Sequence, residues 1–481
     1  MLERELNNKS RKIGNRDIRI PQLEEFRVPL YLPRSRHLKQ LLASNPVLAG
    51  VLGIAAAMVV GGVLLMLPFS NTQGGITPPL FAFFTSVSAV STTGFAIVPT
   101  ATYWSLFGQM VICLLIFIGG IGLVAVVMFN LWVVRSRFTL PDRILTREAL
   151  AADSFEGILP MLRKVIFIDL AITAVGAALL FTTFRNYHDI PTSLWQALFH
   201  SVSAFNTAGY DIVGPTGFIP LQSDAMLLTV TTVEQILGAV GFSVLIEIPL
   251  IRRWRRLSLN TKLVLSTTLV LYLIAIFAMF ANETLLGTSL DEFSFAGKVY
   301  SSVYNALSGA TTTGYMSIDF SQITRQTMVI MAGVMFIGGA TASTAGGIKV
   351  NTVSVIAGAI WSVFRGKPHT EIFGKEIEPN QVWRALAIFS SNIIVLVIGV
   401  VLIMAFNQNI PFEKTLFEAS SALATCGLST GALLELSVAS TLVVIFLMFI
   451  GRIAPLSVAS FFTTSGKAPG RRYPQEKLNM G

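Results

Sequence analysis

Long apolar runs are the feature of this 481-residue sequence that most restricts its fold. A helix needs ~20 apolar residues to cross a bilayer, and eight runs come close to or exceed that length. They are Pro46–Pro68, Leu106–Val134, Val165–Phe184, Met226–Ile251, Leu263–Ala281, Met328–Val363, Trp383–Phe406 and Thr441–Phe462. Charged residues make up only 13% of the chain, whereas a soluble domain carries about 25%. The sequence therefore predicts an all-helical polytopic membrane protein.

A short glycine motif lies between the two members of each pair of runs. The copies are STTGF at Ser91–Phe95, NTAGY at Asn206–Tyr210, TTTGY at Thr311–Tyr315 and ATCGL at Ala424–Leu428. Their glycines are 115, 105 and 113 residues apart, and each copy follows a short amphipathic run. A period of this length predicts four copies of one larger unit, which consists of a span, a short pore helix, a glycine loop and a second span. Four such units around one axis would enclose a pseudo-fourfold pore.

The basic residues indicate which side of the membrane each segment faces. The net charge is +9, and 29 of the 35 Lys and Arg lie in five places. These are Met1–Ser44, Arg135–Lys164, Arg252–Lys262, Arg365–Arg384 and Lys467–Lys477. Because cytoplasmic loops are enriched in Lys and Arg, both termini are predicted to be cytoplasmic and the glycine motifs to face outward. The positive charge is thus explained by topology, and nucleic acid is not an expected partner.

These patterns divide the chain into seven segments. We expect a cytoplasmic tail (1–45), repeat 1 (46–134), a cytoplasmic connector (135–164) and repeat 2 (165–251). Repeat 3 (260–366), repeat 4 (381–464) and a second cytoplasmic tail (465–481) follow.

The glycine loops have the composition of a cation filter. A dehydrated monovalent cation needs oxygens in place of its water shell, and rings of backbone carbonyls supply them. Glycine permits the positive φ that such a backbone requires. The predicted ion site consists of Thr93, Gly94, Ala208, Gly209, Thr313, Gly314, Cys426 and Gly427. The alternative is four ordinary outer turns, and Asp211 and Asp319 just beyond two of them either attract cations or are simple solvated acids.

Two features interrupt the apolar runs of repeats 3 and 4. Gly338–Gly347, GGATASTAGG, contains only small residues, several of which have weak helix preference. Discontinuous helices recur in ion-translocating proteins, although small residues are also common where membrane helices touch. Arg452 is a charge inside a span, which is costly and usually faces a cavity or a partner. Near the ion pathway its guanidinium would raise the barrier to cations and could pair with backbone carbonyls of Gly338–Gly347, and a structural salt bridge with Glu234 or Glu247 is the alternative.

The chain resembles the Ktr/Trk/HKT superfamily of potassium transporters, most closely the Ktr membrane subunit. The resemblance covers about Pro46 to Thr464 and rests on the four glycine motifs, on GGATASTAGGIKVNT and on IGRIAPLSVAS. We expect the chain to lack the two further N-terminal spans of the related Trk subunits. The resemblance implies one potassium pathway per protomer, with one filter glycine in each repeat and potassium at the filter carbonyls. In plant relatives a serine at the first filter position accompanies sodium preference, so Gly94 favours potassium.

The resemblance also implies a gate, partners and a location. The implied gating residues are Gly338, Gly339, Thr341, Ser343, Thr344, Gly346, Gly347, Lys349 and Arg452. The implied partners are a cytosolic ring of RCK/KTN-type nucleotide-binding regulatory subunits, a second copy in a homodimer, and the lipid of a bacterial-type plasma (inner) membrane. Sodium is implied as a stimulating ion, and neither an organic cofactor nor enzymatic activity is expected in this chain.

Two other classes of protein remain as alternatives. A secondary active transporter would couple the cation to sodium or protons, and this class favours inverted repeats. The basic residues instead give all four repeats the same orientation. A non-conducting subunit that scaffolds an ATPase would not need filter glycines.

Overall fold

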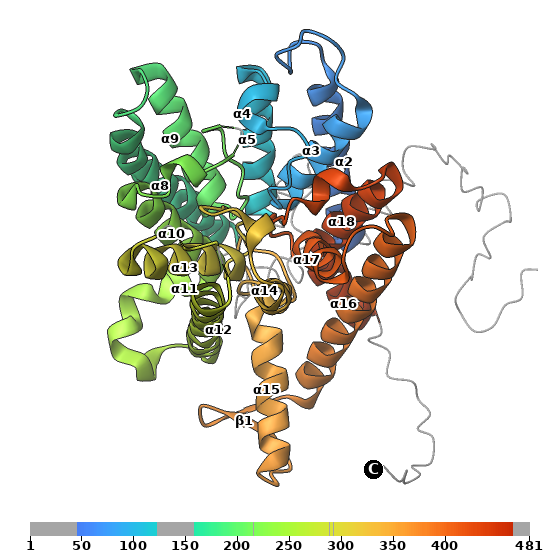
Figure 1. Ribbon diagram of the computed structural model, residues 1–481. Coiled ribbons are helices and arrows are strands. Elements are labelled where there is room, and N and C mark those ends of the chain that lie inside the picture. Colours follow the sequence, from blue (N-terminus) through green and yellow to red (C-terminus); the bar gives the residue numbers. More distant parts are fainter. Residues whose placement is uncertain (1–45, 123–157, 215, 288, 292, 465–481) are drawn as a thin grey trace, which may run out of the picture. The chain divides into compact units, whose positions relative to one another are not determined.

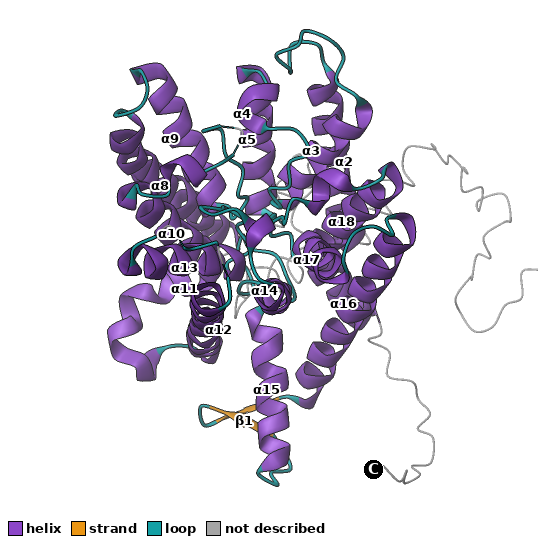
Figure 2. Ribbon diagram, in the orientation of Figure 1, coloured by secondary structure: helices purple, strands orange, loops and turns teal. Residues whose placement is uncertain are grey.

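The computed structural model describes residues 46–122, 158–214, 216–287, 289–291 and 293–464. The expected tails (1–45 and 465–481), most of the connector and the end of repeat 1 lie outside the described residues. The compact unit that begins at Asn45 is almost entirely helical in its described part (Figure 2).

One helical pattern occurs four times in the chain (Figure 1). Each repeat has a first helix, a pore helix, a glycine loop and a second helix. In repeats 1 and 2 these helices are α2 (Pro46–Met66), α3 (Pro79–Ser91) and α5 (Leu106–Ile121), then α8 (Ile158–Phe184), α9 (Ile190–Phe205) and α10 (Ala225–Val240). In repeats 3 and 4 they are α12 (Leu259–Leu285), α13 (Phe295–Ala310) and α14 (Arg325–Ile337), then α16 (Pro379–Phe406), α17 (Phe412–Leu423) and α18 (Val438–Thr464). The expected all-helical polytopic fold is confirmed.

Shorter elements connect these helices. The loops between the pore helices and the second helices contain α4 (Thr100–Tyr103), η2 (Ile219–Leu221), η4 (Phe320–Gln322) and η5 (Ala432–Glu435). After the second helices come α11 (Phe242–Glu247), η3 (Ile248–Arg256) and α15 (Val350–Phe364). A small antiparallel hairpin of β1 (Thr370–Ile372) and β2 (Lys375–Ile377) joins α15 to α16, with Thr370 opposite Ile377.

The pore helices begin at favourable N-terminal residues and end inside the protein. Pro79 and Pro191 lie in the first turns of α3 and α9, where a missing N–H costs nothing. Ser294 caps α13 by accepting a hydrogen bond from the N–H of Gly297 at 3.2 Å. The C-terminal half of every pore helix is buried.

Helix contacts between repeats form a closed ring. The second helix of each repeat packs against the pore helix of the next repeat: α5 against α9, α10 against α13, and α14 against α17. The ring closes where α18 packs against α3. Buried apolar clusters fill these seams, and one of them contains Val90 of repeat 1 with Met448 of repeat 4. This packing places the four glycine loops around one centre.

Two second helices, α10 and α14, are shorter than the expected spans Met226–Ile251 and Met328–Val363. Among the described helices, only α12, α16 and the Arg163–Phe184 part of α8 are long and apolar enough to cross a membrane alone. The prediction of one continuous span at Met226–Ile251 is wrong, because α10 ends at Val240 and Gly241 turns the chain with φ 91° into α11. A β-carbon at Gly241 would lie 2.9 Å from the carbonyl oxygen of Thr341, so glycine makes room for repeat 3 here.

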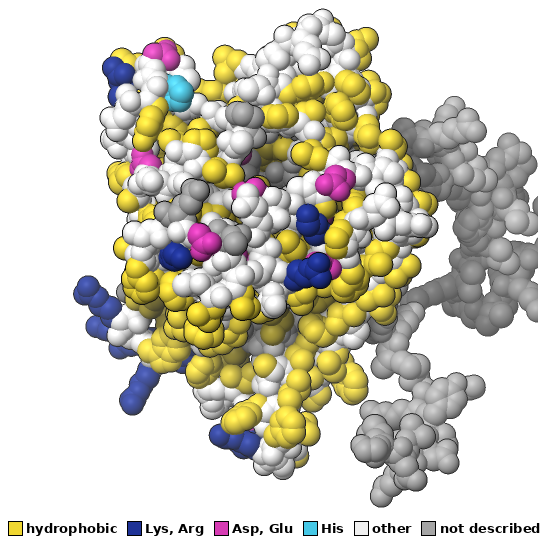
Figure 3. Space-filling model, in the orientation of Figure 1, with side chains coloured by type: hydrophobic (Ala, Val, Ile, Leu, Met, Phe, Trp, Pro, Cys, Tyr) yellow, Lys and Arg dark blue, Asp and Glu magenta, His cyan; other side chains and the backbone are white. Residues whose placement is uncertain are grey.

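The outward-facing helix surfaces are apolar. Phe167 on α8 is 72% exposed, Phe277 on α12 is 73% exposed and Val401 on α16 is 59% exposed. Hydrophobic side chains are spread widely over the face shown in Figure 3, with few charged ones between them. Soluble monomers rarely expose large contiguous apolar patches, so this surface fits the hydrocarbon core of a bilayer.

Candidate functional site

The four glycine loops share one backbone conformation. Their glycines all have positive φ, with values of 83° at Gly94, 63° at Gly209, 94° at Gly314 and 90° at Gly427. The threonine two residues before each glycine is also left-handed, with φ between 49° and 57°: Thr92, Thr207, Thr312 and Thr425. This conformation costs a non-glycine residue about 1–2 kcal/mol. Its occurrence at the same position of all four loops indicates a common structural requirement.

Each of these glycines lies against the backbone of the next repeat. A β-carbon added to any of them would collide with the carbonyl oxygen of the residue that precedes the glycine in the following repeat. The pairs, glycine first, are Gly94–Ala208, Gly209–Thr313, Gly314–Cys426 and Gly427–Thr93. The contacts run from repeat 1 through repeat 4 and back to repeat 1. All eight residues of the predicted ion site therefore meet in one closed ring, which we call the filter ring.

The pore helices end at the filter ring in the same way. The N–H of the residue before each glycine donates to a serine carbonyl of its own pore helix at 2.8–2.9 Å. The pairs are Thr93–Ser88, Ala208–Ser203, Thr313–Ser308 and Cys426–Ser421. The C-terminal end of a helix carries partial negative charge, so four such ends directed at one ring favour a cation there.

Three pore helices also hold the chain beyond the glycine. In each of them the side chain nine residues before the filter glycine accepts a hydrogen bond. The donor is the backbone N–H of the residue three positions after that glycine. The pairs are His200 with Ile212 at 3.1 Å, Asn305 with Ser317 at 3.0 Å and Glu418 with Thr430 at 2.8 Å. These contacts were not predicted from the sequence, although a polar residue lies nine positions before every motif glycine: Thr85, His200, Asn305 and Glu418.

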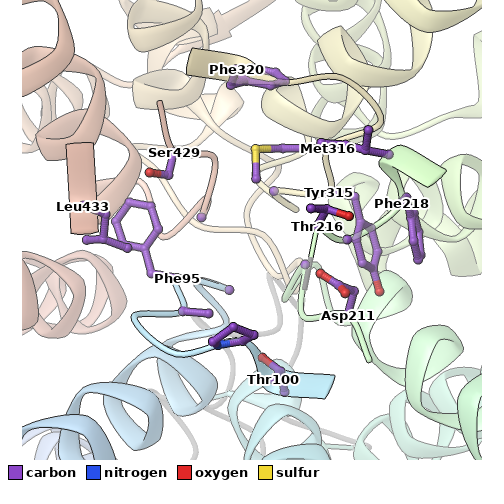
Figure 4. Close-up of a pocket in the computed structure, with 18 of the residues that line it drawn as sticks. Phe95, Thr100, Asp211, Thr216, Phe218, Tyr315, Met316, Phe320, Ser429 and Leu433 are labelled. Carbon is purple, nitrogen blue, oxygen red and sulfur yellow. The ribbon is translucent and has the colours of Figure 1, made fainter. Parts of the chain in front are cut away.

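A cavity of about 430 Å³ opens on one face of the filter ring (Figure 4). All four filter glycines line it, and so do Asp211 and Asp319. Burial raises the pKa of Asp211 to about 7, although two backbone N–H groups oppose the shift. Burial also pushes the pKa of Asp319 up, but hydrogen bonds from Ser321 and Gln322 outweigh it and lower that pKa. The cavity thus has one ionised acid and one that titrates near neutral pH.

A non-helical segment between α14 and α15 lies at the other face of the filter ring. We call this segment, Gly338–Lys349, the gating segment after its predicted role; it extends two residues beyond the predicted Gly338–Gly347. Gly338, Gly347 and Lys349 have φ of 68°, 75° and 92°. A β-carbon at Gly338 would collide with the carbonyl oxygen of Gly346, so the two ends of the segment lie against each other.

Hydrogen bonds join the gating segment to repeats 2 and 3. The N–H groups of Ala340 and Thr344 donate to the carbonyls of Ala239 and Gly238 at 2.9 and 3.2 Å. The N–H of Gly346 donates to the hydroxyl oxygen of Thr312, a filter-loop residue, at 2.8 Å. The segment is therefore in direct contact with the filter.

The remaining predicted gating residues stabilise the segment itself. The N–H of Gly339 donates to the carbonyl oxygen of Gly346 at 3.3 Å, and the N–H of Thr341 donates to Asn351 Oδ1 at 2.9 Å. Ser343 Oγ donates to the carbonyl of Ala340 at 2.6 Å, and Lys349 Nζ to that of Gly346 at 3.3 Å.

Arg452 connects the gating segment to repeat 1. Its guanidinium donates to Thr92 Oγ1 at 3.1 Å, to the carbonyl oxygen of Thr344 at 3.0 Å and to that of Gly119. The alternative of a salt bridge is wrong for the described residues. Glu234 accepts a hydrogen bond from Ser201, and Glu247 accepts two from Ser258 at 3.1 Å.

Known proteins are similar to this chain in sequence. The cation transport protein family TrkH matches residues 50–469. The Ktr system potassium uptake protein B of Bacillus subtilis is 33% identical over 433 residues, which cover 89% of this chain and 95% of the relative. The potassium/sodium uptake protein NtpJ of Enterococcus hirae is 30% identical and covers 91% and 97%.

A solved structure has the same fold. The potassium transporter TrkH from Vibrio parahaemolyticus matches with a TM-score of 0.65 at 18% identity, over 88% of this chain and 85% of that chain. The resemblance inferred from the four glycine motifs, GGATASTAGGIKVNT and IGRIAPLSVAS is therefore confirmed. The chain belongs to the TrkH family of cation transport proteins.

Proposed function

We propose that this protein takes up potassium across a plasma membrane through a gated pore enclosed by its four repeats. The closed filter ring carries the proposal, because four filter glycines each lie against a carbonyl of the next repeat. Two relatives that match 89% and 91% of this chain are named a potassium uptake protein and a potassium/sodium uptake protein. The protein acts as a transporter that makes and breaks no covalent bond.

Potassium is the substrate, and the filter backbone is what binds it. A cation that enters the ring exchanges water for carbonyl oxygens contributed by all four loops. The ring leaves no space for a side chain at its glycines, so backbone oxygens are the groups within reach of the ion. The cavity with Asp211 and Asp319 lies on the face from which potassium enters, and its acidic side chains raise the local concentration of cations.

The gating segment and Arg452 control passage below the filter. The segment lies against the filter loop through Gly346 and Thr312. A guanidinium beside a cation pathway raises the electrostatic barrier to a cation, and this one also holds the segment through Thr344. Opening then requires the segment and the Arg452 side chain to move together.

Ion-coupled transport is a second candidate, and two buried acids in repeat 2 favour it. Ser86 Oγ donates to the Met58 carbonyl at 2.6 Å, and Ser201 Oγ to that of Thr173 at 2.8 Å, which aligns the first helices of repeats 1 and 2. Under this alignment Asp169 occupies the place of Ile54. In the second helices Gly119 and Gly238 lie against the equivalent carbonyls of Val90 and Phe205, which puts Glu234 at the place of Leu115. All four of these side chains are buried. Buried carboxylates inside a membrane protein are typical of sodium or proton pathways. Coupling predicts that Glu234→Gln abolishes accumulation driven by a sodium or proton gradient.

The cellular setting is part of the proposal. We place the protein in a bacterial-type inner membrane with both termini in the cytoplasm, because the basic residues gather in the tails and between repeats. Cytosolic nucleotide-binding subunits of the RCK/KTN type, a homodimer and stimulation by sodium follow from the Ktr resemblance.

The test of the filter uses potassium and sodium uptake into cells that lack their own potassium uptake systems. The wild type should restore growth at low potassium, and Gly314→Ser should weaken potassium selectivity, because a β-carbon there collides with the Cys426 carbonyl. The matched control is Gly333→Ser, since a β-carbon at Gly333 meets no atom within 4 Å. If Gly314→Ser matches this control in both affinity and selectivity at equal membrane content, the loops are ordinary turns and the proposal fails.

A further inference from the structure

Two tyrosines reach from one filter loop to the preceding one. The Tyr210 hydroxyl lies 3.1 Å from the carbonyl oxygen of Phe95 and 3.3 Å from that of Thr85. The Tyr315 hydroxyl lies 3.1 Å from the carbonyl oxygen of Tyr210 and 3.3 Å from that of His200. In both cases the acceptors are the residue after the filter glycine and a pore-helix residue ten positions earlier. A hydroxyl has one proton, so each tyrosine shares it between two carbonyls of the preceding repeat.

The other two seams of the filter ring lack such a hydroxyl. The equivalent position is Leu428 in repeat 4 and Phe95 in repeat 1. By the same register the carbonyls at these seams are those of Tyr315 and Leu428, and neither a leucine nor a phenylalanine side chain can donate a hydrogen bond to them. Among the described residues, no side-chain hydrogen bond is made to either of these two carbonyls.

The pore-helix serines of repeats 1 and 2 reinforce the tyrosine contacts. Ser88 Oγ donates to the carbonyl of Phe95 at 2.9 Å, and Ser203 Oγ to that of Tyr210 at 2.8 Å. The carbonyl after the filter glycine therefore receives two side-chain donors in each of these loops. Because one donor lies on the loop's own pore helix and the other on the neighbouring repeat, together they fix the position of these carbonyls.

The equivalent serines of repeats 3 and 4 behave differently. The hydroxyl of Ser308 has no partner among the described residues. Ser421 Oγ instead accepts a hydrogen bond from the N–H of Gly427 at 3.0 Å. Two filter loops are thus clamped by a tyrosine and a serine, and two are not.

We propose that the hydroxyl groups of Tyr210 and Tyr315 set the selectivity of the filter between potassium and sodium. This inference rests on the proposed function, since it requires the loops to be an ion filter. Sodium is smaller than potassium, so the ring must contract to coordinate it. Clamped carbonyls oppose that contraction, because it would stretch hydrogen bonds to the neighbouring repeat. The tyrosines are positioning residues: they act through the backbone and do not touch the ion.

The experiment compares Tyr210→Phe and Tyr315→Phe with Tyr304→Phe in the full-length protein. Cells without their own potassium uptake systems express each variant at matched membrane content, and the ratio of sodium to potassium uptake is measured. Phenylalanine keeps the ring and removes only the hydroxyl. Tyr304 is a suitable control because it is also buried, while its hydroxyl lies 3.5 Å from Thr231 and bonds to no filter carbonyl.

We expect the ratio to rise about threefold to tenfold in both tyrosine variants, the range that one net hydrogen bond supports. It should stay at the wild-type value in Tyr304→Phe. The reciprocal variant Phe95→Tyr adds a hydroxyl at the seam between repeats 4 and 1, where it faces the Leu428 carbonyl, and should lower the ratio.

The inference is overturned if both tyrosine variants keep the ratio of the Tyr304→Phe control. Should those two variants fail to reach the membrane, Phe95→Tyr decides: a lower ratio supports the inference and an unchanged ratio overturns it. Gly314→Ser is measured alongside. If Gly314→Ser alters selectivity while the tyrosine variants do not, only this inference fails. An unchanged ratio of sodium to potassium uptake in Gly314→Ser refutes the proposed filter and with it the proposed function.

Discussion

Replacing Arg452 with glutamine should release the gating segment. The arginine donates to Thr92, Thr344 and Gly119, which belong to a filter loop, the gating segment and the second helix of repeat 1. The glutamine side chain is shorter and uncharged, so it cannot bridge these three elements. The same change removes a positive charge from beside the proposed cation pathway. Both effects should increase uptake.

The bond to Thr344 sets the size of the effect, because it is the arginine contact that holds the segment. A hydrogen bond to a charged group contributes about 1.5–3 kcal/mol, which corresponds to about a 10- to 150-fold shift between the closed and open forms. The uptake rate should rise by up to this factor. The hydrogen bond from the N–H of Gly346 to the Thr312 hydroxyl remains in the variant and still restrains the segment.

The assay is the initial rate of rubidium uptake into potassium-depleted cells. Arg452→Lys should give an intermediate rate, because lysine keeps the charge but lacks the planar fork that reaches three acceptors. The control is Arg325→Gln, whose side chain is 82% exposed and pairs with Glu413 at 2.9 Å on the surface. An unchanged or lower rate in Arg452→Gln, with the control equal to wild type, would refute this account of the gate.

Three further outcomes follow from the geometry. Because the pKa of Asp211 is raised to about 7, its carboxylate is charged above that pH and neutral below it. Uptake at limiting potassium should therefore fall as the external pH drops from about 8 to 6. Asp211→Asn should make uptake slow at every pH. Asp319→Asn should keep the pH dependence of the wild type. A β-carbon at Gly346 would collide with the Ala424 carbonyl, so Gly346→Ala should lower the thermal unfolding midpoint in detergent, whereas Gly333→Ala at an open helical position should raise or preserve it. Arg325→Gln should leave the thermal unfolding midpoint close to that of the wild type, because an exposed ion pair contributes less than about 1 kcal/mol to the free energy of unfolding.

The main elements of this fold could be predicted because their signals are local. Apolar runs, glycine motifs and a block of small residues each lie within a few tens of residues, so the four repeats and the interruption at Gly338–Gly347 were visible in the sequence. The extension of that interruption to Lys349 was not, since a lysine with φ of 92° is held by surrounding contacts and not by its own preference. The break at Gly241 was missed for the same reason, because the chain must leave room there for Thr341 of another repeat.

The contacts of individual side chains were beyond the sequence. The Tyr315 hydroxyl reaches a carbonyl 105 residues earlier, and Arg452 reaches Thr92 across 360 residues. Such pairs depend on how each pore helix is rotated against its neighbour, which is decided by packing between repeats. Pairing with carbonyls of the small-residue segment was the favoured expectation for Arg452, and a salt bridge with Glu234 or Glu247 was the alternative. The sequence could not single out the acceptors, which are Thr92 Oγ1 and the carbonyls of Thr344 and Gly119. The boundaries of the predicted segments and the roles of the filter and gating residues stay predictions.

Having all four filter loops on one polypeptide changes what a single mutation can do. In a channel assembled from four identical subunits, one codon change alters every quadrant of the conduction path at once. Here it alters one quadrant, so ion preference can drift in small steps that selection can test separately. Pairs of substitutions in neighbouring quadrants, such as Gly94 with Ala208, should show non-additive effects because they share a contact. Pairs in opposite quadrants should add, which would give the order of the loops around the axis from transport data alone.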